Sequence, residues 1–171
     1  MLIRLSNNDD DFSYLAKVEQ SAARKFTEYF GNDTSDIGRT LGSEILINAH
    51  QNKSLWIAAE KEDIVGFLAA TTIDNALHIQ EVSVAFEHQG KSIGRALLEA
   101  VTLETKNRQY PYVSLTTDRT IPWNKKFYER VGFKEISLNE CLPGLSRILI
   151  HDKKHSPVPE DRIAMVLTVN F

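Results

Sequence analysis

A short turn in the middle of the chain carries groups that could hold a phosphate. The segment HQGKSIG, residues 88–94, follows a strand-like run and precedes a helix-like pattern. The first N–H groups of a helix lack acceptors within the helix, and its dipole is positive at that end, so both favour an anion. Lys91 and Arg95 add positive charge. The turn therefore predicts a phosphate or pyrophosphate site, for which two ligands can be considered.

The first possibility is the nucleotide-binding P-loop, G-x-x-x-x-G-K-S, beginning at residue 85. Ala85 stands where that loop needs a glycine to bend tightly around the β-phosphate. No convincing apolar strand ending in a magnesium-binding aspartate follows, since Asp118 closes the polar run SLTTD. A small P-loop protein remains an alternative, as does a plain surface turn with a solvated Lys91.

The second possibility is a pyrophosphate cradle of the form Q/R-x-x-G-x-G/A. Residues 89–94, QGKSIG, match it except at Ser92. If that position needs a positive φ, serine is strained where glycine would not be. About thirty residues later, Asn124 and Tyr128 are four apart and share one face of a predicted helix. Tyr128 could also be a core ring with a satisfied hydroxyl.

The elements that must position these groups follow from hydrophobic periodicity. Strands are predicted at 1–6, 54–60, 63–73, 76–84, 112–117, 134–138 and 163–171. Helices are predicted at 7–30, within 33–52, from Gln89, from Pro122 to a left-handed cap at Gly132, and at 142–150, followed by a polar loop at 151–161. The fold class is α/β: a mixed, mainly antiparallel twisted sheet of about seven strands with helices on both faces.

The strand at 76–84 changes its apolar phase. Leu77 and Ile79 share one face, whereas Val82 and Val84 share the other. A β-bulge produces such a slip, and a strand buried on both faces would show the same pattern. The sequence leaves both explanations open.

Composition limits the class of protein. The chain has 171 residues, 42% of them hydrophobic and 25% charged, and a net charge of −3, which suits one domain over 1–171 and gives no basic field for nucleic acid. Cys141 is alone, and His151 and His155 lack a third ligand, so no disulfide and no metal are expected. Without a signal peptide or a membrane-spanning apolar run, a cytoplasmic protein is expected.

The order and spacing of these pieces resemble the GNAT N-acetyltransferase superfamily. The hairpin strands, the loop HQGKSIGRALL and the helix NKKFYERVGF carry the resemblance, which covers nearly the whole chain. It implies acetyl-coenzyme A as donor and acetyl transfer to a primary amine, on a small molecule or a peptide, by direct attack through a tetrahedral intermediate. A homodimer is possible. A catalytically idle acyl-CoA-binding sensor is the main alternative.

The resemblance also implies roles for particular residues. Tyr128 is expected to protonate the departing thiolate, and the Val84 N–H to polarise the thioester carbonyl. The residues expected to bind the donor are Val82, Ser83 and Val84 along the pantetheine arm, Gln89, Gly90, Lys91, Ser92, Ile93, Gly94 and Arg95 around the pyrophosphate, and Asn124 and Tyr128 on the later helix.

An amine must lose a proton to attack, which calls for a base tuned toward neutral pH. Glu81, one residue before the pantetheine segment, is the predicted base, although water or an exposed salt bridge are alternatives for it. His78 and His88 are weaker alternatives for the base, and they are expected to be surface or structural histidines. A set of acidic residues would suit a cationic amine, and a solvated surface is the alternative explanation for it. Its members are Glu28, Asp33, Asp36 and Glu44.

Overall fold

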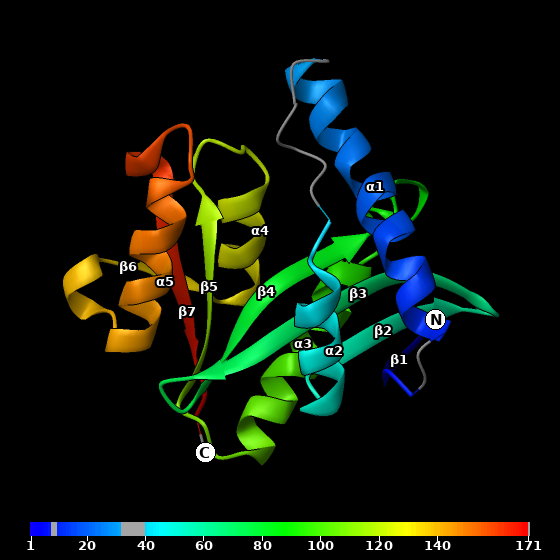
Figure 1. The fold of residues 1–171 in the computed structure, drawn as a ribbon, viewed down its shortest axis with the longest axis horizontal. Coiled ribbons are helices and arrows are strands. Elements are labelled where there is room, and N and C mark those ends of the chain that lie inside the picture. The colour runs from blue at the N-terminus through cyan, green and yellow to red at the C-terminus, as the bar shows by residue number, and fades with distance from the viewer. Residues whose placement is uncertain (8–9, 32–39, 171) are drawn as a thin grey trace. The chain divides into compact units, whose positions relative to one another are not determined.

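The computed structural model describes residues 1–7, 10–31 and 40–170 (Figure 1). Its seven strands form one sheet in the order β1-β2-β3-β4-β5-β7-β6, and all but one of the recorded ladders are antiparallel. The strands are β1 Leu2–Leu5, β2 Leu55–Glu60, β3 Asp63–Ile73, β4 Ala76–Val84, β5 Tyr112–Asp118, β6 Lys134–Ile136 and β7 Arg162–Thr168. The helices are α1 Asp10–Phe30, α2 Ser43–Gln51, α3 Ile93–Asn107, α4 Asn124–Val131 and α5 Pro143–Lys154. The predicted fold class is confirmed.

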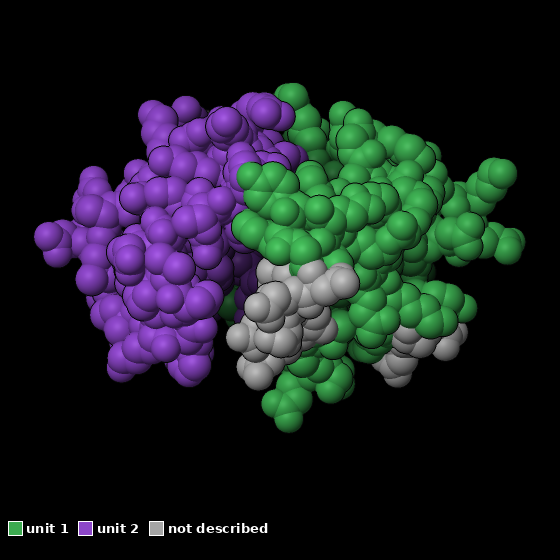
Figure 2. Space-filling model, turned by 90° about the horizontal axis from the view of Figure 1, so that it is seen from above, with its two compact units in different colours: residues 1–71, 81–100 green, residues 72–80, 101–171 purple. Residues whose placement is uncertain are grey.

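The chain divides into two compact units, coloured separately in Figure 2. Unit 1 comprises residues 1–71 and 81–100, and unit 2 comprises residues 72–80 and 101–171. The backbone crosses from one unit to the other within β3, within β4 and within α3. That residues 1–171 act as a single domain stays a prediction.

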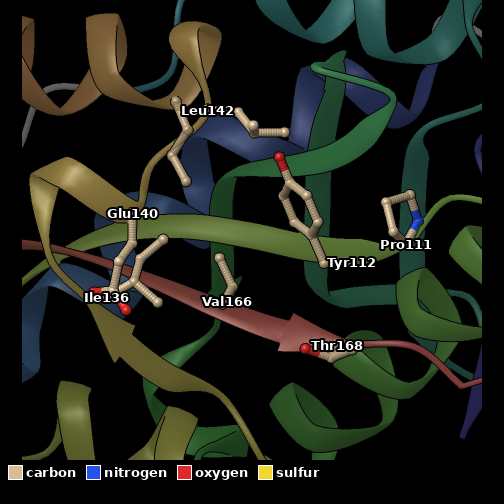
Figure 3. Close-up of a pocket in the computed structure, with 8 residues that line it drawn as sticks. Pro111, Tyr112, Ile136, Glu140, Leu142, Val166 and Thr168 are labelled. Carbon is tan, nitrogen blue, oxygen red and sulfur yellow. The ribbon is translucent and has the colours of Figure 1, made fainter.

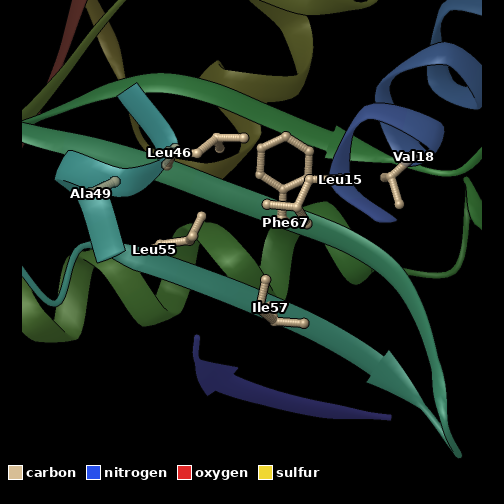
Figure 4. Close-up of a cluster of buried hydrophobic side chains, with 8 residues drawn as sticks. Leu15, Val18, Leu46, Ala49, Leu55, Ile57 and Phe67 are labelled. Atoms are coloured by element: carbon tan, nitrogen blue, oxygen red, sulfur yellow. The ribbon is translucent and has the colours of Figure 1, made fainter. Parts of the chain in front are cut away.

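Unit 1 is built on the antiparallel strands β1, β2 and β3. One face of this sheet is covered by α1 and α2, whose apolar side chains pack against alternate strand residues (Figure 4). This core consists of Leu15, Val18, Leu46, Ala49, Leu55, Ile57, Phe67 and Ala69. Gly66 points to the opposite face, where a Cβ would lie 3.0 Å from the Ser83 carbonyl oxygen and 3.4 Å from Ile93 of α3. Helices therefore lie on both faces of this unit.

Unit 2 joins β5, β7 and β6 by antiparallel ladders and adds the first half of β4 in parallel to β5. The β3–β4 turn, Asp74 and Asn75, has positive φ at both residues, as a two-residue hairpin turn requires. The Asp74 carboxylate accepts the N–H groups of Gly144 and Leu145, each at 2.9 Å. It thereby satisfies the first turn of α5 from a position about seventy residues earlier.

Strand β4 departs from simple alternation in its first half. Residues 76–79 are all buried, whereas Val82 and Val84 are only half-buried. The parallel ladder to β5 holds three pairs and ends at Ile79 with Leu115. The first half of β4 is therefore buried on both faces, and a bulge in its second half stays a prediction.

Three predicted boundaries were wrong. Helix α3 begins at Ile93 and not at Gln89, because Gly90 and Ser92 have φ of 75° and 64°, which a right-handed helix cannot include. Helix α4 begins at Asn124, with Trp123 as its cap, so Pro122 precedes the helix. Residues 151–154, predicted as loop, extend α5. The left-handed cap at Gly132 is confirmed, with φ of 109°.

Candidate functional site

The turn before α3 has the backbone of an anion cradle. After the short 3-10 turn Phe86–His88, Gly90 and Ser92 both take left-handed φ, and the Ser92 carbonyl accepts the Ala96 N–H at 3.0 Å to begin the helix. A serine in this conformation costs roughly 1–2 kcal/mol relative to glycine. The Lys91 side chain is exposed beside the turn. These features suit a bound phosphate group.

The side chain of Gln89, which was predicted to bind the donor, makes a hydrogen bond within the protein. Its Nε2 donates to the Val84 carbonyl oxygen at 3.1 Å, which ties the turn to the end of β4. The carboxamide therefore holds the shape of the cradle. The side chains of Val84 and Ile93 both approach Gly66, each lying 3.4 Å from where a Cβ on that residue would be, so the strand end and the helix start pack on the same part of β3.

Helix α1 holds the same turn from the other side of the loop. The Ser21 hydroxyl oxygen accepts the Phe86 N–H at 3.0 Å, and Arg24 forms an ion pair with Glu87. The Arg24 guanidinium also lies 4.5 Å from the centroid of the Phe86 ring. The position of the 3-10 turn, and of the cradle that follows it, thus depends on α1.

Two carboxylates lie near each other in unit 1. Glu81 accepts the Ser83 hydroxyl at 2.7 Å, and both belong to the same face of β4. Glu19 of α1 accepts the Leu41 N–H with both oxygens, at 2.9 and 3.1 Å. Burial raises the pKa of Glu19 to about 7, the Leu41 N–H opposes this, and the charge of Glu81 adds to it.

Sequence reasoning missed Glu19. Its spacing from Leu15 placed it on the core-facing side of α1, but its contacts come from residues 22 and more positions away. Of the predicted acidic set, Glu28 and Glu44 are exposed, and Asp33 and Asp36 lie outside the described residues.

Unit 2 holds the remaining predicted residues on α4. Asn124 donates from Nδ2 to the Thr117 hydroxyl at 3.2 Å, at the end of β5. Tyr128 is half-buried, with its ring centroid 5.2 Å from that of Phe127 and 5.8 Å from that of Phe133. The other predicted residues, 81–84 and 89–95, lie together in unit 1.

A partly buried set of polar side chains extends over β4, β5, α5 and β7 in unit 2. His78 Nδ1 lies 3.0 Å from the Ser114 hydroxyl, and burial lowers the pKa of His78 to about 4. Asp152 accepts from Thr116, and Arg162 donates to Thr116 at 3.0 Å and to Asp152 at 3.3 Å. His78 is therefore structural, one of its two predicted roles. The Nδ1 atom of His88, in unit 1, lies 3.3 Å from the Oε2 atom of Glu60.

Unit 2 also contains a small pocket of about 230 Å³ (Figure 3). Its walls are mainly apolar, and burial raises the pKa of Tyr112 in its lining. The lining residues are Pro111, Tyr112, Ile136, Glu140, Leu142, Leu145, Val166 and Thr168. None of them was predicted to bind the donor, and none supplies a cation for a phosphate.

The described part of the chain has neither a metal-binding cluster nor a membrane-spanning helix. No three His, Cys, Asp or Glu side chains among residues 1–7, 10–31 and 40–170 are grouped to hold a metal ion. Within those same ranges, no helix has the length and apolar character needed to span a membrane.

Comparison with known proteins gives a consistent result. A family model described as an acetyltransferase (GNAT) domain matches residues 51–135, which include the cradle and α4. A probable N-acetyltransferase camello of Xenopus tropicalis is 34% identical over 98 residues, covering 56% of this chain and 44% of its own length. The chain thus spans less than half of that relative.

Two solved structures share the fold. N-acetylglutamate synthase of Neisseria gonorrhoeae, complexed with coenzyme A and N-acetyl-glutamate, matches with a TM-score of 0.72 and 16% identity, over 99% of this chain and 35% of that one. A ribosomal-protein-alanine N-acetyltransferase of Brucella melitensis matches with a TM-score of 0.70 and 17% identity, over 99% of this chain and 100% of that one.

Proposed function

Because the chain belongs to the GNAT acetyltransferase superfamily, we propose that it transfers the acetyl group of acetyl-coenzyme A to a primary amine. The acceptor is a small molecule or a peptide, and the amine attacks the thioester directly through a tetrahedral intermediate. Acetyl-coenzyme A supplies the activated acetyl carbon. A cytoplasmic location and a homodimer stay predictions.

The observation that carries this proposal is the left-handed turn at the start of α3. Gly90 and Ser92 open the backbone there, and Lys91 stands beside it. A pyrophosphate would be bound by N–H groups of residues 90–95 and by the charges of Lys91 and Arg95. Gln89 contributes by tying this turn to Val84.

The chemistry would need groups on β4 and α4. Val82, Ser83 and Val84 would pair with the pantetheine arm, and the Val84 N–H would polarise the thioester carbonyl. Asn124 would hold the same arm, and Tyr128 would protonate the departing thiolate. Glu81 is the predicted base for the amine.

Calorimetry tests the donor assignment. We expect saturable binding of acetyl-coenzyme A without magnesium and no comparable binding of ATP. Gly94→Trp, at the first turn of α3, should abolish that binding by blocking the phosphate. The matched control is Leu103→Trp on the same helix, where the side chain is 60% exposed, and it should bind normally. Magnesium-dependent ATP binding without a coenzyme A signal would instead favour the P-loop alternative.

An amine panel, followed by release of free thiol from acetyl-coenzyme A, tests the reaction. Turnover with at least one primary amine is expected. Tight donor binding with no thiol release from any amine would favour the idle acyl-CoA-binding sensor.

A further inference from the structure

We infer that Glu19 of α1 is the general base of the proposed transfer, and that Glu81 acts on it electrostatically. The inference rests on the proposed function. Glu19, which no sequence motif identified, would accept the proton that the amine must lose.

Packing directs the Glu19 carboxyl toward the sheet. Leu15 and Val18 are buried in the core beneath α1 (Figure 4). Glu19 comes one turn after Leu15, so it belongs to the same face of the helix. Glu19 is only half-buried, so the residue lies at the margin of the core and keeps some contact with solvent.

The backbone of Leu41 fixes the orientation of that carboxyl. The Leu41 N–H lies 2.9 and 3.1 Å from its two oxygens, so a single donor is shared between them. A carboxylate has about four acceptor positions. Capacity therefore remains on Glu19 to accept a proton from an amine.

Glu81 approaches from β4. It shares one face of the strand with Ser83, whose hydroxyl donates to it at 2.7 Å, while Val84 points to the α3 side near Gly66. The negative charge of Glu81 acts on Glu19. Arg24, five residues after Glu19 on α1, is paired with Glu87. The carboxylates of α1 and β4 thus act on each other, and together they would attract a cationic amine.

The two carboxylates differ in their fitness as a base. Burial raises the pKa of Glu19 to about 7, against the effect of the Leu41 N–H and with a contribution from Glu81. A base is most effective when its pKa lies near the working pH. One acceptor position of Glu81 is already taken by the Ser83 hydroxyl.

In the proposed transfer the ammonium group loses two protons and the thiolate takes up one. One passes from the ammonium group to Glu19, and the free amine attacks the acetyl carbon. When the C–S bond breaks, the nitrogen loses a second proton to water, and the thiolate takes one from Tyr128, which regains it from water. Glu19 returns its proton to solvent after the amide leaves. The reaction thus converts an ammonium ion and a thioester into an amide, a thiol and one released proton.

The test is the pH dependence of kcat/KM, measured by thiol release with an amine that the wild-type protein acetylates. The wild-type rate should fall about tenfold per pH unit below about pH 7. Glu19→Gln should lower kcat/KM by about 10²-fold at pH 8 and remove that limb. Its amide oxygen can still accept the Leu41 N–H, so acetyl-coenzyme A affinity should change little and thermal unfolding at pH 8 should not move to lower temperature.

Glu81→Gln is the matched comparison. Removing a negative charge near Glu19 lowers the pKa of Glu19, so the limb should persist and move to lower pH. Glu19→Asp keeps a proton acceptor and should restore part of the rate that Glu19→Gln loses.

Two results would overturn the inference: an unchanged limb in Glu19→Gln, or loss of the limb in Glu81→Gln. Failure of the proposed function would look different, since the wild-type protein would then release no thiol with any amine.

Discussion

Burial shifts the pKa values of two ionisable side chains, one in each unit, in opposite directions. Glu19 in unit 1 is half-buried, and burial raises the pKa of its carboxyl to about 7. His78 in unit 2 is 4% exposed, and burial lowers the pKa of its imidazole to about 4. Burial favours the neutral form in both, but one group is an acid and the other a base.

The two side chains also differ in their access to solvent, which a group that exchanges protons with a substrate needs. His78 is neutral throughout the physiological range and faces Ser114 inside unit 2, so no substrate proton is expected to reach it. Glu19 changes its charge near neutral pH at a position still open to solvent. A shifted pKa indicates function only where access accompanies it.

The largest expected effect concerns the pH dependence of stability at His78. The unfolded chain takes up a proton at His78 near pH 6.5 and the folded chain near pH 4. Between these values the unfolded state binds more protons, so stability is kept above pH 6.5 and falls by about 3 kcal/mol on the way to pH 4. Urea unfolding at pH 7, 5.5 and 4 measures this. His78→Asn cannot take the proton and should lose less stability over that range; an equal loss would contradict the assignment.

The next largest effect concerns the network beside His78. Asp152→Asn keeps an oxygen for Thr116 but removes the negative charge that faces Arg162. Arg162 Nε is buried without a hydrogen-bond partner among the described residues. We expect a loss of about 2 kcal/mol in the free energy of unfolding.

An exposed ion pair provides the control for Asp152→Asn. Glu99 pairs with Arg95, and both side chains are about 60% exposed. Glu99→Gln should change stability little, because solvent screens such a pair. Equal effects of the two substitutions would show that burial contributes nothing to the network.

Glu19 should make the free energy of unfolding change with pH in the opposite direction to His78. The folded state holds the Glu19 proton up to about pH 7, whereas the unfolded chain releases it near pH 4.5. Stability is therefore full below pH 4.5 and is lost as the pH rises to 7, by about 1 kcal/mol after allowance for solvent at this half-exposed group. Glu19→Gln does not have this loss, so its free energy of unfolding relative to wild type should rise by about 1 kcal/mol between pH 4.5 and pH 8. Urea unfolding at the two pH values measures this. No relative gain would break the comparison with His78.

The smallest expected effect lies in the cradle. Ser92 has φ of 64°, and Ser92→Gly relieves that strain but makes the unfolded chain more flexible. The net change in unfolding free energy should stay within about 1 kcal/mol. Acetyl-coenzyme A binding, measured by calorimetry, should be equal or tighter. Weaker binding would mean that the serine hydroxyl itself contacts the donor.

Local signals explain what the sequence could predict of the fold. The hairpin of β2 and β3 follows from two apolar runs joined by a short polar turn, and Gly132 ends α4 because the left-handed cap favours glycine. The start of α3 was placed too early, because the pattern of apolar residues does not reveal the left-handed φ of Ser92. The last turn of α5 was missed because its polar residues resemble a loop, although lysines at a helix C-terminus are favourable.

The candidate site divides in the same way. The cradle was predictable because its residues are contiguous, from Gln89 to Arg95. Glu19 was not, because its protonation depends on burial in the folded chain and on two residues far along the sequence, the N–H of Leu41 and the charge of Glu81. The contact from Gln89 to Val84 was also missed, since a motif does not record where a side chain points.

The contact between Asp74 and α5 limits where the gene can be divided. Residues 72–80 belong to unit 2 although they stand inside the sequence of unit 1. A fragment that began at residue 101 would contain α5 but lack the carboxylate that binds the N–H groups of Gly144 and Leu145. No single cut yields two chains that each carry one whole unit. Recombination with a relative would therefore have to exchange the β3–β4 turn together with the C-terminal half.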